Sequence, residues 1–226
     1  MTDSPLLAIT GGTGFVGLYV IKAALGAGYR VRALIRTPSK KPDISDANLS
    51  WHTGALGHDD TAFLEGVDTV IHMAGLIKAP RRADYDKVNA HAAGALAEAA
   101  KNAGVTRFVL LSSMAAREPQ LSDYAASKHA GEAAVRAAFP GPIAIIRSPA
   151  VFGPGDEATA PFFAAMKNGI LPVPGGRGWK DRRLSMVYVP DLARAIINNG
   201  ASGNYDGRIV SPATITDMGW QDFAKI

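Results

Sequence analysis

Cysteine is absent from the 226 residues, which excludes disulfide bridges, thiolate metal sites and thiol nucleophiles. No apolar run approaches the ~20 residues needed to span a bilayer, and the N-terminal segment leads into a strand-like run rather than a signal peptide. The 5 histidines show no ligand spacing with carboxylates, so we expect no metal. These absences favour a cytoplasmic protein that has no membrane partner.

The charge balance gives no reason to expect a nucleic-acid partner. The chain has 24 Lys and Arg against 20 Asp and Glu, and the basic residues are spread among the acidic ones. Hydrophobic residues make up 47% and charged residues 19%, which is an ordinary globular composition and excludes intrinsic disorder. At this length one α/β domain can hold the whole chain.

Short apolar runs alternate with longer Ala-rich stretches of helical period, as in successive βα units. This alternation predicts an α/β fold with a doubly wound parallel sheet of the Rossmann type. The expected strands are Leu6–Thr10, Arg30–Ile35, Leu49–Thr53, Thr69–Met73, Arg107–Leu111 and Ile143–Arg147. The expected helices are Gly14–Ala27, Thr61–Leu64, Ala83–Ala103, Tyr124–Phe139 and Ala160–Asn168.

After Phe152 the chain becomes rich in Gly and Pro, a composition typical of loops on a rigid scaffold. A strand over Leu184–Val189, a helix over Pro190–Asn199 and an extended piece over Gly207–Val210 follow. The last residues read as the start of another helix after Thr216, which predicts that the small C-terminal region is truncated.

Three glycines form a G-x-x-G-x-x-G pattern between the first strand and the first helix. Glycines allow a tight turn and close approach of the backbone to a pyrophosphate, whose charge is favoured at a helix N-terminus. The alternative is a plain βα turn. The candidate cofactor contacts in this loop are Gly11, Thr13, Gly14, Phe15, Val16 and Gly17.

A second pattern carries the chemistry. Tyr124 and Lys128 are four residues apart on one face of an expected helix, and Ser113 ends the fifth strand. A nearby ammonium lowers the pKa of a phenol, so we expect Tyr124 to move a proton at a substrate oxygen while Ser113 holds that oxygen. In isolation, Tyr-x-x-x-Lys also fits an amphipathic helix with a surface lysine.

Together these segments resemble the extended short-chain dehydrogenases/reductases, the NAD-dependent epimerases and dehydratases, over nearly the whole chain. The resembling segments are TGGTGFVG, GVDTVIHMAG, Ser112–Ser113, YAASK from Tyr124, and RSPAVFGPGD from Arg147. The resemblance implies an NAD(P)-binding region over 1–150 and substrate-binding loops over 151–226, within one structural domain. It adds cofactor contacts at Leu56, Met73, Ala74, Gly75, Asn89, Tyr124, Lys128, Pro149 and Val151.

This chain departs from the family pattern at several points. Ala55 replaces the acidic residue that precedes Leu56, Phe152 replaces a common tyrosine and Ser148 replaces a proline. Asn89 could instead be an exposed polar residue. Trp179 and Arg183 fall in the segment that resembles the substrate loop, where an arginine often faces the substrate.

The residue after the second strand bears on the choice of cofactor. Arg36 stands where an acid would bind the ribose of NAD, and Lys40 and Lys41 follow it. These cations favour the 2′-phosphate of NADP. The alternative is a solvated basic loop in an enzyme that uses NAD.

The sequence therefore predicts an NAD(P)-dependent oxidoreductase or epimerase that acts on a hydroxyl or ketone of a nucleotide sugar or another small alcohol. The rival hypothesis is a dinucleotide-binding sensor or assembly subunit without turnover. Retention of both Tyr124 and Lys128 favours the enzyme. The resemblance also implies a homodimer that pairs through the helices bearing Asn89 and Tyr124.

Overall fold

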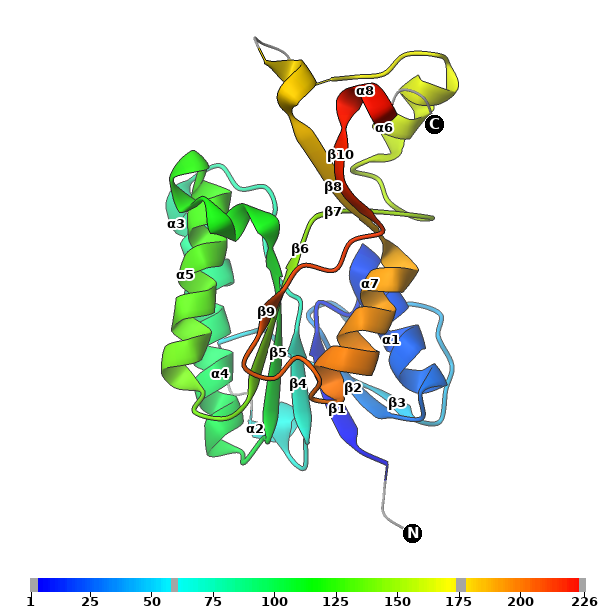
Figure 1. Ribbon diagram of the computed structural model, residues 1–226. Coiled ribbons are helices and arrows are strands. Elements are labelled where there is room, and N and C mark those ends of the chain that lie inside the picture. The colour runs from blue at the N-terminus through cyan, green and yellow to red at the C-terminus, as the bar shows by residue number, and fades with distance from the viewer. Residues whose placement is uncertain (1–3, 58–60, 174–177, 224–226) are drawn as a thin grey trace.

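The computed structural model describes residues 4–57, 61–173 and 178–223. Its central element is a parallel sheet of seven strands in the order β3-β2-β1-β4-β5-β6-β9 (Figure 1). The strands are β1 (Leu6–Thr10), β2 (Arg30–Ile35), β3 (Leu49–Thr53), β4 (Thr69–His72), β5 (Arg107–Ser113), β6 (Ile143–Ser148) and β9 (Ile209–Val210). The order reverses between β1 and β4, so the predicted doubly wound Rossmann-type fold is confirmed.

Helices cover both faces of this sheet because its strands are apolar on both sides. In β1, Leu6 and Ala8 pack into one buried cluster, while Leu7 and Ile9 pack into the other. The first cluster lies under α2 (Thr61–Leu64), α4 (Ala92–Asn102) and α5 (Asp123–Ala138); the second lies under α1 (Phe15–Gly26) and α7 (Val189–Ala195). Figure 1 shows these two helical layers on either side of the sheet.

A smaller, three-stranded sheet stands beyond the carboxyl ends of the central strands (Figure 1). It consists of β7 (Ala150–Phe152), β8 (Arg183–Tyr188) and β10 (Ile215–Gly219), and α6 (Ala160–Lys167) and α8 (Trp220–Phe223) lie beside it. Aromatic rings hold this region together: Phe152 lies 5.6 Å from Phe163 and 5.5 Å from Tyr188 between centroids. We call this region the cap.

The structure corrects the sequence-based elements in three places. The predicted helix Ala83–Ala103 is divided into α3 (Arg82–Asp86), a π-helical turn (Lys87–His91) and α4. The predicted strand Leu184–Val189 begins and ends one residue earlier, as β8, and pairs with β7 and β10 in the cap. Of Gly207–Val210, only the last two residues form a strand, and β9 joins the central sheet beside β6.

Within the described residues, no helix is long and apolar enough to cross a membrane, and no group of His, Asp and Glu could hold a metal ion.

Candidate active site

A cleft of ≈ 900 Å³ opens at the carboxyl ends of the central strands, on the side of the cap. Ligands of doubly wound folds bind at this edge of the sheet. The structure brings most of the predicted site residues to this one cleft. These are Gly11, Thr13, Gly14, Phe15, Val16, Gly17, Met73, Gly75, Ser113, Tyr124, Lys128, Pro149 and Val151.

Two glycines in the loop after β1 are required by geometry. Gly11 has φ +76°, and a Cβ there would lie 2.7 Å from the backbone nitrogen of Ala74. A Cβ on Gly17 would lie 2.1 Å from the carbonyl oxygen of Gly11. Real Cβ atoms do not approach backbone this closely. These glycines therefore allow β1, α1 and the chain after β4 to meet at the floor of the cleft.

The N-terminus of α1 faces this cleft with its backbone donors available. Gly14 is the N-cap residue, no side chain among the described residues caps it, and its first turn has no acidic residue. Phe15, Val16 and Gly17 line the cleft. Unpaired N–H groups and the helix dipole favour a bound anion, so this end of the cleft fits the pyrophosphate of a dinucleotide.

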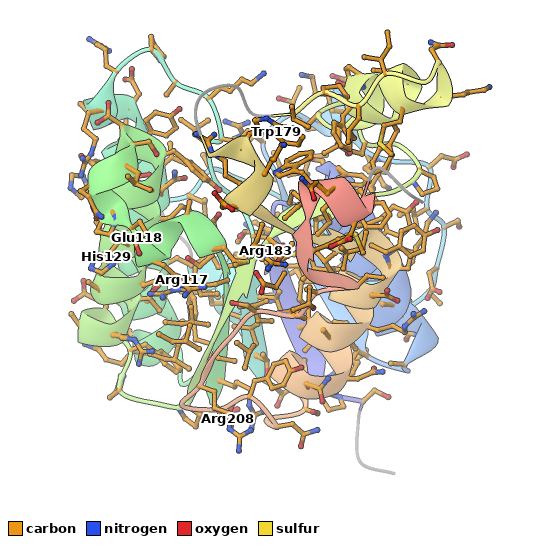
Figure 2. The ribbon with its side chains drawn as sticks, turned by 45° about the horizontal axis from the view of Figure 1, so that its top comes forward. Arg117, Glu118, His129, Trp179, Arg183 and Arg208 are labelled. Carbon is orange, nitrogen blue, oxygen red and sulfur yellow. The ribbon has the colours of Figure 1, made fainter. Side chains whose placement is uncertain are left out.

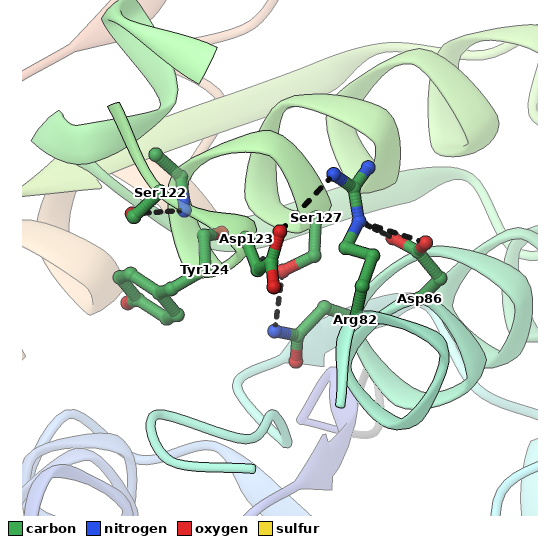
Figure 3. Close-up of polar contacts among 8 residues, drawn as sticks. Arg82, Asp86, Ser122, Asp123, Tyr124 and Ser127 are labelled. Carbon is green, nitrogen blue, oxygen red and sulfur yellow. Dashed lines mark hydrogen bonds and ion pairs between the residues drawn. The ribbon is translucent and has the colours of Figure 1, made fainter. Parts of the chain in front are cut away.

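Tyr124 lies in the first turn of α5. The Ser122 hydroxyl accepts a hydrogen bond from the backbone N–H of Ala125 at 3.1 Å and so starts the helix (Figure 3). Burial raises the pKa of the Tyr124 phenol, and hydrogen bonding with the Ser113 side chain partly opposes this. We expected Lys128 to lower this pKa; burial instead raises it.

Ser113 is oriented toward the phenol by its own backbone contact. Its Oγ accepts a hydrogen bond from the backbone N–H of Ala115 at 3.2 Å. A hydroxyl has a single hydrogen, which therefore remains available for Tyr124 or for a substrate oxygen. The arrangement brings the two hydroxyls together at one wall of the cleft.

Lys128 lies one helical turn after Tyr124. Its Nζ donates a hydrogen bond to the carbonyl oxygen of Leu111 at 2.8 Å, which anchors the side chain to β5. Burial lowers the pKa of the Lys128 ammonium to about 8, and the charge of Glu132 acts in the opposite direction. A Cβ on Gly75 would stand 3.9 Å from this Nζ, so the chain after β4 passes close to the ammonium.

Asn89 is buried, so the alternative of an exposed polar residue is wrong. Its side chain accepts a hydrogen bond from the backbone N–H of Leu76 at 2.8 Å and donates to the Leu76 carbonyl at 2.9 Å. It also donates to the Ser127 hydroxyl at 3.0 Å (Figure 3). Asn89 thus ties the loop after β4 to α5 and does not itself line the cleft as described.

Three further predicted residues also stand outside the described lining of the cleft. Arg36 follows β2 directly and is exposed. Leu56 is half-buried and packs on the core cluster under α4 and α5. The backbone N–H of Ala74 donates to the Thr10 hydroxyl at 3.3 Å, beside the first glycine of the loop.

Other residues of the site were not singled out in the sequence. The ring of Tyr85, on α3, lies 6.2 Å from that of Tyr124 between centroids. Glu132 is buried one turn after Lys128, and its position four residues further along the helix is the signal that could have found it. The remaining additions line the cleft: Leu18, Leu76, Ile77, Leu111, Met114, Ala115, Ala150, Gly155, Asp156, Glu157 and Ala158. Ser112 and Ser148, which the sequence analysis named for other reasons, line it as well.

The cap residues that resembled a substrate loop are partly engaged with each other. Lys180 Nζ lies 5.9 Å over the ring of Trp179. A guanidinium nitrogen of Arg183 donates to the Asp217 carbonyl at 3.3 Å, across β8 and β10. Figure 2 shows Trp179 and Arg183 on the cap. Neither Trp179 nor Arg183 belongs to the described lining of the cleft.

Comparison with known proteins agrees with this arrangement. The NAD dependent epimerase/dehydratase family matches residues 7–203. A ceramide reductase of Caulobacter vibrioides is 43% identical over 195 residues, which are 85% of this chain and 60% of that protein. The mitochondrial NADH dehydrogenase [ubiquinone] 1 alpha subcomplex subunit 9 of Mus musculus is 32% identical over 200 residues, 84% of this chain and 52% of that protein.

Among solved structures, the UDP-glucuronic acid 4-epimerase of Bacillus cereus with NAD has a TM-score of 0.80 at 20% identity. The match covers 96% of this chain and 81% of that one, and at this identity it shows the shared fold. The chain spans only 60% of the length of the ceramide reductase. From the extent of the family match, this chain belongs to the NAD-dependent epimerase/dehydratase family, in the extended branch of the short-chain dehydrogenases/reductases.

Proposed function

We propose that this protein is an NAD(P)-dependent oxidoreductase that reduces a ketone, with Tyr124 as the proton donor to the carbonyl oxygen. The observation that carries the proposal is the meeting of Ser113, Tyr124 and Lys128 in the cleft that also contains the glycine-rich loop. A bound nicotinamide would supply the hydride. Residues of the glycine-rich loop would hold its pyrophosphate, and Lys128 its ribose hydroxyls.

The protonation states of Tyr124 and Lys128 suit the reduction of a ketone. Because burial raises the pKa of Tyr124, the phenol keeps its proton at neutral pH and can donate it as charge develops on the carbonyl oxygen. The Ser113 hydroxyl would donate a second hydrogen bond to that oxygen. Lys128 retains its charge up to about pH 8 and stabilises the phenolate that forms when Tyr124 gives up its proton.

The lining of the cleft favours an uncharged, largely apolar substrate. Leu76, Ile77 and Met114 line it, and Ile77 is 67% exposed. In the described lining, Lys128 is the only Lys or Arg, and Asp156 and Glu157 are the other charged residues. Diphosphate groups are usually bound by cations. The relative named a ceramide reductase supports the same substrate class.

The cofactor is proposed to be NADP, with NAD as the alternative. Arg36 lies at the carboxyl end of β2, exposed, with Lys40 and Lys41 in the loop that follows. A cation at this position accommodates the 2′-phosphate of NADP. Dimerisation through the helices that carry Asn89 and Tyr124 also remains a proposal.

A second candidate is a dinucleotide-binding subunit without turnover, because one relative is a subunit of NADH dehydrogenase. Calorimetric titration with NADPH and NADH, followed by absorbance assays in the same preparation, separates the two. The panel should contain ceramide-type and short ketones together with UDP-glucose. NADPH oxidation with a ketone supports the enzyme, and activity with UDP-glucose alone contradicts the apolar substrate. Binding without turnover favours the subunit, and no binding overturns both.

A further inference from the structure

Glu132 lies buried behind the site, with both carboxylate oxygens bonded. Its Oε1 accepts hydrogen bonds from the Ser112 hydroxyl at 2.5 Å and from Arg147 Nε at 2.9 Å. Its Oε2 accepts from Arg147 Nη2 at 2.7 Å. The side chain of Glu132 is 6% exposed and that of Arg147 17%. Two oxygens that both accept from a guanidinium identify the ionised form of the carboxyl.

These contacts join three elements of the site. Ser112 and Arg147 are direct partners across β5 and β6, and Glu132 reaches both from α5. The next residue along β5 is Ser113, and the residue before Ser112 is Leu111, whose carbonyl accepts from Lys128. Glu132 therefore holds the end of β5, which carries both Ser113 and the carbonyl bonded to Lys128, and links it to β6 through Arg147.

We propose that Glu132 is a positioning residue that ties β5 and β6 to α5 and supplies the anion that keeps Lys128 charged beside Tyr124. The inference rests on the proposed function for its consequence in catalysis. The effect of Glu132 on the charge of Lys128 involves only side chains of this protein, so it does not depend on a bound cofactor.

Of the charged groups around Lys128, Glu132 is the one that stabilises its protonated form. On α5 itself, Tyr124 and Glu132 lie one turn to either side. From β4, the buried His72 interacts electrostatically with Lys128 and is held neutral by burial, which lowers the His72 pKa to about 3. From β6, Arg147 keeps its positive charge because the bond to Glu132 raises the pKa of that guanidinium.

From α3, the ring of Tyr85 faces that of Tyr124, whose raised pKa keeps its phenol protonated at neutral pH. Among the described residues on these elements, Glu132 is thus the anion whose charge acts on Lys128. Removing that anion while Arg147 stays cationic makes the surroundings of Lys128 more positive.

The test measures the titration of Lys128 directly, by NMR of protein labelled with [ε-¹³C]lysine, with Lys128→Met to assign the signal. In Glu132→Gln we expect the pKa of Lys128 to fall by about one unit or more, since an adjacent opposite charge is lost. In Arg147→Gln, which keeps the carboxylate and removes its counter-charge, we expect the pKa to rise. A merely structural role would not give shifts of opposite sign.

Asp206→Asn is the matched control. It breaks the Arg107–Asp206 ion pair, which joins β5 near its amino end to the turn before β9 and is likewise partly buried. The variant should lower stability without moving the Lys128 titration. If Glu132→Gln does not fold, Arg147→Gln still decides the question. An unchanged Lys128 pKa in a folded Glu132→Gln or Arg147→Gln variant overturns the proposal.

The same variants connect the titration to catalysis. In Glu132→Gln, the fall of kcat/KM on the alkaline side should begin at a pH lower by the shift seen in the NMR titration. If the wild-type protein reduces no ketone but Lys128 shifts as expected, the electrostatic role of Glu132 is supported and the proposed function fails. If ketone reduction is present and Lys128 does not shift, the proposed function stands and the role of Glu132 is refuted.

Discussion

Gly17 stands so close to the carbonyl oxygen of Gly11 that a Cβ at position 17 would lie 2.1 Å from it. This close approach joins the first turn of α1 to the end of β1 at the floor of the cleft. Gly26 at the end of the same helix has no atom within 4 Å of its Cβ position. Gly26 therefore serves as a control for Gly17, since both lie in α1 but only Gly17 is crowded.

Gly17→Ala should lower the free energy of unfolding by about 3 kcal/mol, because backbone rather than a flexible side chain must move. Gly26→Ala should raise it by about 0.5 to 1 kcal/mol, because alanine loses less conformational entropy in a helix. Chemical denaturation followed by circular dichroism measures both. Equal stability of the two variants would contradict the proposed contact.

Tyr124→Phe should slow ketone reduction by about 100- to 10,000-fold while cofactor affinity stays nearly unchanged, because only the transferred proton is lost. Steady-state assays and calorimetric titration with NADPH measure the two quantities. Tyr29→Phe is the control, since Tyr29 packs on the core cluster under α1. Full activity in Tyr124→Phe would refute the role given to the phenol.

Arg36→Glu should reduce the preference for NADPH over NADH by about tenfold or more, because a charge-assisted contact with the 2′-phosphate is replaced by repulsion. The ratio of the two dissociation constants is the readout. Arg208→Glu makes the same charge change at an exposed site beside β9, away from the cap (Figure 2). A ratio that changes equally in both variants would leave Arg36 without a specific role.

The pKa of about 8 for Lys128 predicts that kcat/KM falls as the pH rises above about 8, when the ammonium loses its proton and no longer stabilises the Tyr124 phenolate. Lys128→Arg keeps a positive charge at high pH, so any remaining activity should lose this alkaline fall. A pH–rate profile for both proteins tests this. A fall that persists unchanged in Lys128→Arg would assign it to another group.

The lowered pKa of the buried His72 side chain predicts that the protein loses stability in acid. The Thr10 hydroxyl accepts from the backbone N–H groups of Met73 and Ala74, so its hydrogen is donated to His72 Nδ1 at 2.7 Å. Burial lowers the pKa of His72 from 6.5 to about 3. Between these values the unfolded chain binds the proton first, so the stabilisation present above pH 6.5 is lost as the pH falls toward 3.

The expected slope from this group is about 1.4 kcal/mol per pH unit. It should be missing in His72→Gln and retained in His91→Gln, whose histidine is exposed on the π-helical turn. Denaturation midpoints measured from pH 7 to 4 give the comparison. A wild-type slope that survives in His72→Gln would have to come from carboxylates instead.

The sequence by itself determined the order of βα units, the glycine-rich turn and the four-residue spacing of Tyr124 and Lys128. These are local properties, because hydrophobic period and spacing along one helix depend on neighbours in the chain. The predicted strands Leu6–Thr10, Arg30–Ile35 and Leu49–Thr53 are confirmed for the same reason.

Tertiary structure alone decided the rest. The division of the helix around Asn89 accompanies hydrogen bonds to Leu76 and Ser127, which come from other elements. The pKa of Tyr124 is raised rather than lowered because burial depends on everything packed around the ring. Glu132 meets Ser112 and Arg147 only where α5, β5 and β6 come together, a contact that no spacing within one segment contains.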